Sequence, residues 1–142
     1  MDLPLPDEPR HRAANAWLAD ALDDLANARA LSRHRDEATS PFAAAFHAQQ
    51  AVEKGLKALL IWHGIACPPR HDLGLLLGLL PMEMATSQLP VAGLTVYAVD
   101  QRYATGSADP MSLNERPTWT EADDAISAAA HALDVIAADL AA

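Results

Sequence analysis

The stretch that decides the fold is FHAQQAVEKGLKALLIWHGI, residues 46–65, near the middle of the 142-residue chain. Its apolar residues recur at helical spacing, and alanine and leucine, which favour helix, dominate it. Ser40 and Pro41 ahead of it suit the cap and the first turn of a helix, and Gly64 suits the residue just past a helix end. We therefore predict a long helix from Phe42 to His63.

Helical spacing is also found on both sides of this stretch. Further helices are predicted at residues 10–34, 73–80 and 90–104, and from Thr118 or Thr120 to the end of the chain. Aromatic residues make up only 5% of the sequence, and no segment shows the alternation of a strand. The patterns predict an all-α fold, an up-and-down four-helix bundle with an additional short helix.

Length and composition set the expected organisation and location. Residues 1–8 are expected to be a disordered leader, and residues 9–142 a single helical domain. The only cysteine is Cys67, so an intrachain disulfide is excluded and a cytoplasmic location is favoured. No apolar run approaches the ~20 residues that a membrane span needs, so we expect no membrane association.

The charge of the chain is negative but unevenly distributed. The net charge is −9, which disfavours broad affinity for nucleic acid. Eight of the ten Lys and Arg residues lie within residues 1–71, so a confined basic site can still exist. No histidine or cysteine spacing fits a metal site and no glycine-rich phosphate loop occurs, so we expect no metal and no cofactor.

Several polar residues of the central helix fall on one face: His47, Gln50, Lys54 and Lys57. Glu53 borders this face and can pair with Lys57 in the favourable i,i+4 order. The face can be a patch for phosphate or a partner, or a solvated surface with an ordinary ion pair. Either Gln49 or Gln50 is expected to face inward, where its amide needs a partner.

Two other places hold candidate ligand-binding residues. Arg70 and His71 precede Asp72, which suits a helix cap, so they can attract an anion, or His71 can only fix the connector. Arg102 is the best single candidate because basic residues are rare in its half of the chain. Tyr103 can stack on a base or bury its ring.

Residues 46–65, followed by PRHDL at 69–73, resemble the HEPN domain (higher eukaryotes and prokaryotes nucleotide-binding). WLADALDDLANA at 17–28, DQRY at 100–103 and TEADDA at 120–125 add to the resemblance. The resemblance implies a helical bundle that commonly forms homodimers. It also implies a partnership with a small nucleotidyltransferase in a toxin–antitoxin-like system. Another branch of the family consists of metal-independent ribonucleases that act across a dimer interface.

The ribonuclease signature of that branch is an arginine followed, after four to six residues, by a histidine. No histidine follows Arg102 at this spacing, and Arg29 with His34 fits it only outside the corresponding segment. The catalytic candidates that remain are Arg102, His71 and His47. A module that binds a nucleotide or a nucleotidyltransferase is therefore ranked first, a structural oligomerisation bundle second, and a ribonuclease third.

Overall fold

The computed structural model of the chain describes residues 7–98 and 116–141. Every regular element in these residues is a helix, which confirms the predicted all-α class. The elements are α1 (Asp7–Arg33), α2 (Pro41–Trp62), α3 (Leu73–Gly78), the 3-10 helices η1 (Ala85–Gln88) and η2 (Ala92–Tyr97), and α6 (Trp119–Ala141).

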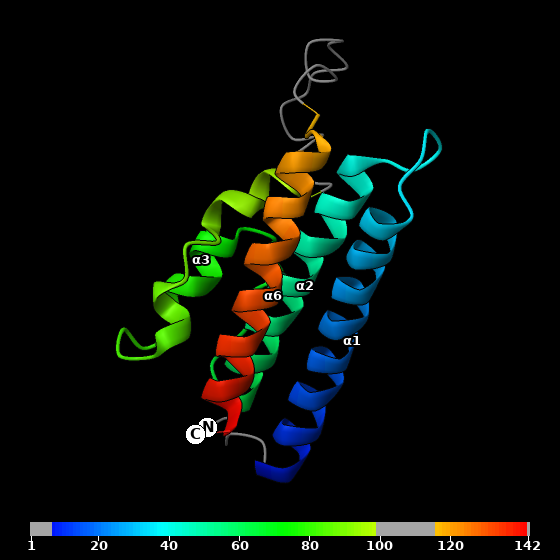
Figure 1. The fold of residues 1–142 in the computed structure, drawn as a ribbon. Helices are drawn as coiled ribbons and strands as arrows, with labels where there is room; N and C mark the ends of the chain where they lie inside the picture. Colours follow the sequence, from blue (N-terminus) through cyan, green and yellow to red (C-terminus); the bar gives the residue numbers. More distant parts are fainter. Residues whose placement is uncertain (1–6, 99–115, 142) are drawn as a thin grey trace.

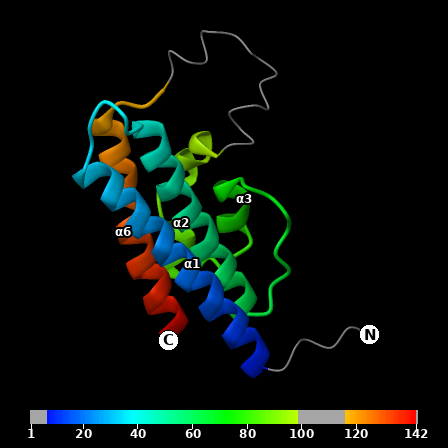
Figure 2. The same ribbon diagram turned by 90° about the vertical axis from the view of Figure 1, so that its right-hand side faces the viewer.

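The long helices α1, α2 and α6 lie side by side, with α3 and the 3-10 helices on the side away from α1 (Figure 1). α1 runs antiparallel to α2, whereas α2 and α6 run in the same direction (Figures 1 and 2). The chain therefore has to return along the bundle between α2 and α6, and in the described residues α3, η1 and η2 lie on this return path. α2 packs against α1, α6, α3 and η2, which makes it the central helix.

Both ends of α2 follow the signals predicted from the sequence. The Ser40 side chain accepts a hydrogen bond from the amide of Ala43, and Pro41 occupies the first turn. Gly64 follows the C-cap residue His63 with φ +69°, the left-handed conformation that glycine adopts without steric cost.

The caps of α3 and α6 also form as the sequence indicates. The Asp72 side chain accepts from the amide of Leu75 at the start of α3. At the start of α6, Thr118 Oγ1 accepts from the amide of Glu121, and Glu121 Oε1 accepts from the amide of Thr118. This reciprocal capping box selects Thr118 over Thr120 as the cap.

The predicted long helix over residues 90–104 is not found in its described part. The chain forms only the 3-10 helix η2 there, and residues 99–104 lie outside the described residues. Gly93 and the β-branched Thr95 and Val96 all lower α-helix propensity, which explains the short element.

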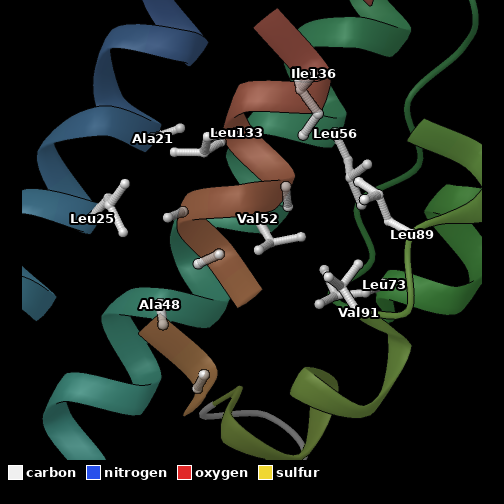
Figure 3. Close-up of a cluster of buried hydrophobic side chains, with 14 of the residues drawn as sticks. Ala21, Leu25, Ala48, Val52, Leu56, Leu73, Leu89, Val91, Leu133 and Ile136 are labelled. Atoms are coloured by element: carbon white, nitrogen blue, oxygen red, sulfur yellow. The ribbon is translucent and has the colours of Figure 1, made fainter. Parts of the chain in front are cut away.

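The core is built from small and branched aliphatic side chains of the three long helices and the return segment (Figure 3). Ala48 and Val52 of α2 are fully buried, as are Leu56 and Ile136. A Cβ atom at Gly55 would lie 2.7 Å from Leu133 Cδ2 and 3.0 Å from Ile136 Cδ1, so α2 and α6 approach closely at this point. The small residues therefore set the spacing of the bundle.

None of the helices in the described part of the chain is long and apolar enough to cross a bilayer.

Candidate functional site

A buried carboxylate of α1 binds two basic side chains of α2. Asp24 Oδ1 lies 2.9 Å from His47 Nδ1, and Asp24 Oδ2 lies 2.7 Å from Lys54 Nζ. The Asp24 side chain is 10% exposed, whereas those of His47 and Lys54 are 30% and 26% exposed. We call these three residues the Asp24 group.

A second buried carboxylate, on α2 itself, has the same kind of partners. Glu53 Oε2 lies 3.1 Å from Lys57 Nζ, in the expected i,i+4 arrangement. Glu53 Oε1 lies 2.8 Å from Nδ1 of His71, which belongs to the connector before α3. The Glu53 side chain is 4% exposed. Glu53, Lys57 and His71 form the Glu53 group.

The Asp24 group and the Glu53 group have the same composition and the same charge. Each contains one carboxylate, one lysine and one histidine, so each has zero net charge when its histidine is neutral and gains one positive charge when the histidine is protonated. Taking a carboxylate out of water costs several kcal/mol unless it is paired and hydrogen-bonded. Because each buried carboxylate needs these partners, it holds the positions of the lysine and the histidine that bind it.

Neutral polar and aromatic side chains extend the Glu53 group. Gln49 is fully buried and donates from Nε2 to Glu53 Oε1 at 3.1 Å, and Gln50 donates to Gln49 Oε1 at 2.7 Å. The predicted inward-facing glutamine is therefore Gln49. Lys57 Nζ lies 5.7 Å from the ring centroid of Trp17 on α1, within reach of a cation–π interaction.

A surface hollow lies between the end of α1 and the start of α2. Its lining residues are Asn27, Ala30, Leu31, His34, Thr39 and His47. His47 belongs both to this lining and to the Asp24 group. We call it the α1–α2 hollow. It brings together two imidazoles from different parts of the chain.

The structure gathers some of the predicted site residues and leaves others apart. His47, Gln50, Lys54 and Lys57 lie along one polar face of α2, and His71 of the connector contacts Glu53, but both lysines are neutralised by carboxylates. Arg70 is exposed in the connector. Arg102 and Tyr103 lie outside the described residues.

Asp24 is the site residue that the sequence analysis did not identify. An aspartate on a surface helix is expected to face solvent, yet Asp24 as a whole residue is only 7% exposed. A signal was present: Trp17, Ala21, Asp24 and Ala28 are spaced by four, three and four residues, the spacing of a helix seam. The opposite holds for the apolar Leu22 of the same helix, which is 51% exposed.

Cys67 lies close to the Glu53 group but is not placed for nucleophilic chemistry. Burial raises the pKa of its thiol, as does the Glu53 carboxylate, while Lys57 lowers it to a lesser degree than burial raises it. A raised pKa leaves less of the reactive thiolate at neutral pH. Among residues 7–98 and 116–141, no three His, Cys, Asp or Glu side chains are grouped so as to hold a metal ion.

The match to known families agrees with this helical arrangement. A family model described as the HEPN domain matches residues 14–138. The chain belongs to the HEPN family. The region matched includes α2 with both buried-carboxylate groups, and it extends through most of α6.

Two solved structures resemble this HEPN chain. One is TT1696 from Thermus thermophilus, with a TM-score of 0.70 and 26% identity, covering 89% of this chain and 97% of that chain. The other is ST0689, an archaeal HEPN homologue, with a TM-score of 0.68 and 25% identity over the same shares of the two chains. The comparison with curated proteins gives no match. The HEPN resemblance predicted from the sequence is thereby confirmed, and so is the HEPN-like helical fold.

Proposed function

We propose that this HEPN chain is a binding module that holds a nucleotide and works with a small nucleotidyltransferase in a toxin–antitoxin-like pair. The observation that carries the proposal is the pair of buried carboxylates, Asp24 and Glu53. Each of them fixes one lysine on the polar face of α2, together with His47 of α2 or His71 of the connector. The chemistry of this face suits a ligand with phosphate and an aromatic base.

The energetics favour a functional role over a purely structural one. Apolar residues of similar volume commonly stabilise a fold as well as a buried ion pair does, or better. A bundle that served only oligomerisation would therefore gain little stability from burying Asp24 and Glu53 in place of apolar residues. A ligand site gains preorganisation, because the lysine and histidine heads are already oriented when a phosphate arrives.

Side chains around the two groups supply complementary contacts. Lys54 and His47 are partly exposed, so Lys54 can donate to a phosphate oxygen while it keeps its carboxylate, and His47 can do so when its ring is protonated. Trp17 offers an aromatic ring next to Lys57, on which a base can stack. Exposed Arg70 adds a positive charge in the connector.

The proposal also includes a homodimer and a partner protein. Leu75, Leu79 and Met82 are exposed, at 44%, 37% and 81%, and they lie in the return segment away from α1. Exposed apolar side chains close together in sequence favour protein contact there. The proposal of a nucleotidyltransferase partner is based on membership of the HEPN family.

Isothermal titration calorimetry with nucleoside mono-, di- and triphosphates tests nucleotide binding. The double variant Asp24→Asn/Lys54→Gln removes both charges of one group while leaving polar atoms in place, and we expect it to weaken binding at least about tenfold. The control is Arg12→Gln on α1, which is exposed and distant in sequence from both groups. Equal affinity in the double variant and the control, or no binding by the natural protein, would contradict the proposal.

A metal-independent ribonuclease is the second candidate, favoured by one observation. His47 Nδ1 is bound to Asp24, which leaves Nε2 as the ring nitrogen that can take or give a proton. Cleavage of a fluorescent RNA in the presence of a chelator, removed by His47→Gln, would support this candidate. Cleavage that persists in His47→Gln and falls with further purification would exclude it.

A further inference from the structure

The α1–α2 hollow combines features that a phosphate site needs, and none of the residues proposed from the sequence except His47 belongs to it. His34 and His47 are on its lining, and Ala30 and Leu31 give it an apolar part. We propose that this hollow binds the phosphate group of a nucleotide through the imidazoles of His34 and His47, with affinity that rises when they are protonated. The inference rests on the proposed function, for which it names the phosphate site and its regulation.

Asp24 determines how His47 meets a ligand. A carboxylate oxygen only accepts hydrogen bonds, so at 2.9 Å it fixes the proton of the neutral ring on Nδ1. Nε2 then carries a lone pair, which repels a phosphate oxygen. When the ring takes up a second proton, Nε2 becomes a donor while Nδ1 still donates to Asp24. Protonation therefore converts His47 from a repulsive contact into a charge-assisted one.

The charges around His47 permit this change. Asp24 faces it from α1, and Lys54 of α2 binds the other oxygen of the same carboxylate. The carboxylate and the lysine cancel, so the proton taken up by His47 is an unbalanced positive charge. A phosphate that enters the hollow supplies the balancing negative charge.

The charges around His34 come from the end of α1, the following turn and α6. His34 is exposed between Arg33 and Arg35, and Arg35 is bound to Asp123 of α6 at 3.2 Å. Asp36 is engaged by the turn, because its Oδ1 accepts from the amides of Ala38 and Thr39. Arg33 is exposed at the end of α1 and adds a positive charge beside His34, while Asp36 and the exposed Glu37 place negative charges in the following turn.

Calorimetry on the full chain at pH 6 and pH 8 tests the inference, with inorganic phosphate, sulfate and adenosine 5′-monophosphate as probes. Sulfate remains a dianion across this range, so its pH dependence reports protonation of the protein alone. If the imidazoles must be protonated to bind an anion, sulfate should bind about tenfold more tightly at pH 6 than at pH 8, and phosphate, which itself loses negative charge towards pH 6, should show a smaller gain. Equal affinities of sulfate at the two pH values, or no binding of either ion at pH 6, would overturn the inference.

Single substitutions locate the site. His47→Gln and His34→Gln are each expected to reduce the pH dependence and to weaken phosphate binding about tenfold at pH 6. The matched control is His131→Gln, which changes an exposed histidine of α6 that does not line the hollow and is expected to leave binding unchanged. A loss of binding in the control equal to that in His47→Gln would count against the hollow.

A direct readout covers the case in which a variant fails to fold. The imidazole resonances of the unaltered protein can be followed by NMR as phosphate is added at pH 6. Shifts of the His34 and His47 resonances, with those of His63 and His131 unchanged, would support the site. Shifts confined to the other histidines would refute it.

The inference and the proposed function can fail separately. If adenosine 5′-monophosphate binds and the His34 and His47 variants bind it equally well, nucleotide binding stands and the hollow is not its phosphate site. If phosphate and sulfate bind with the predicted pH dependence but the nucleotide binds no more tightly than phosphate, the hollow stands as an anion site. Nucleotide binding is then unsupported.

Discussion

Nδ1 of His71 lies 2.8 Å from Oε1 of Glu53, so a residue of the connector is bound to a carboxylate near the middle of α2. Glu53 also binds Lys57 and Gln49, and its side chain is only 4% exposed. One carboxylate therefore links the connector to the central helix, and its loss would leave three polar partners to rearrange.

Replacement of Glu53 is expected to lower the free energy of unfolding. Glu53→Ala removes one member of a buried pair and should cost about 3 kcal/mol, because Lys57 is left mostly buried without its partner. Glu53→Gln should cost less, since the amide keeps a hydrogen-bond acceptor. Urea denaturation followed by circular dichroism measures both. Glu83→Ala, at an exposed position, is the control, and a loss no larger than in that control would refute the role given to Glu53.

Substitution of Gly55 should disturb the contact of α2 with α6. The added Cβ would lie 2.7 Å from Leu133 Cδ2, closer than side chains tolerate, so Gly55→Ala is expected to destabilise the protein by about 1–3 kcal/mol. At Gly78, also in a helix, a Cβ would meet no atom within 4 Å. Gly78→Ala should therefore be neutral or slightly stabilising, and thermal denaturation of both variants and the unaltered protein measures the two effects. Equal losses for both variants would contradict the close packing at Gly55.

Substitution of Gly64 is expected to lower stability because of its backbone conformation, in addition to its packing. At φ +69°, Gly64→Ala should cost about 1–2 kcal/mol, and its Cβ would lie 2.7 Å from Nη1 of Arg10. Asparagine tolerates this conformation better than alanine does, so the backbone effect should be smaller in Gly64→Asn. Adding Arg10→Ala to each variant separates the backbone effect from the clash. If adding Arg10→Ala restores the full stability of Gly64→Ala, the backbone conformation is not the cause of the loss.

Stability is expected to fall at alkaline pH. Burial raises the pKa of the Tyr97 hydroxyl, and Glu121 and Asp124 raise it further; burial also raises the pKa of the Cys67 thiol. In both cases the folded state holds its proton more tightly than the unfolded chain does. The resulting stability is complete below the unfolded pKa and is lost as pH rises through the folded pKa.

Denaturation midpoints measured from pH 8 to pH 11 check this expectation. Tyr97→Phe and Cys67→Ala remove the titrating groups, so the decline of their stability with pH should be smaller than that of the unaltered protein. If stability falls with pH as steeply in the double variant Tyr97→Phe/Cys67→Ala as in the unaltered protein, other groups cause the decline.

The sequence predicted those parts of the fold that local signals determine. Ser40, Gly64 and Asp72 are placed where the helix caps of α2 and α3 require them, and the apolar spacing of α6 agrees with its buried face. The region of residues 90–98 was predicted less well. Its apolar residues suit a helix, but Gly93, Thr95 and Val96 weaken the α-helical signal, and the 3-10 helix that forms packs against α2 and α3.

The candidate site was predicted only where its contacts are local. Glu53 and Lys57 are four residues apart on one helix, so their ion pair could be expected. The contacts of Asp24 with His47 and Lys54 join two helices, and they depend on how α1 is rotated against α2. The only sequence signal for that rotation is the helical spacing of Asp24 with the buried residues Ala21 and Ala28, and this signal is weak.

The central position of α2 has a consequence for the order in which the protein opens. α2 contacts α1, α6, α3 and η2, and most of the residues from Ala44 to Leu60 are buried. Its amides can reach solvent only when several partner elements separate at once. In a deuterium-exchange experiment, α2 should therefore be the last helix to exchange, at a rate set by global unfolding, while the exposed turn at residues 34–38 exchanges early.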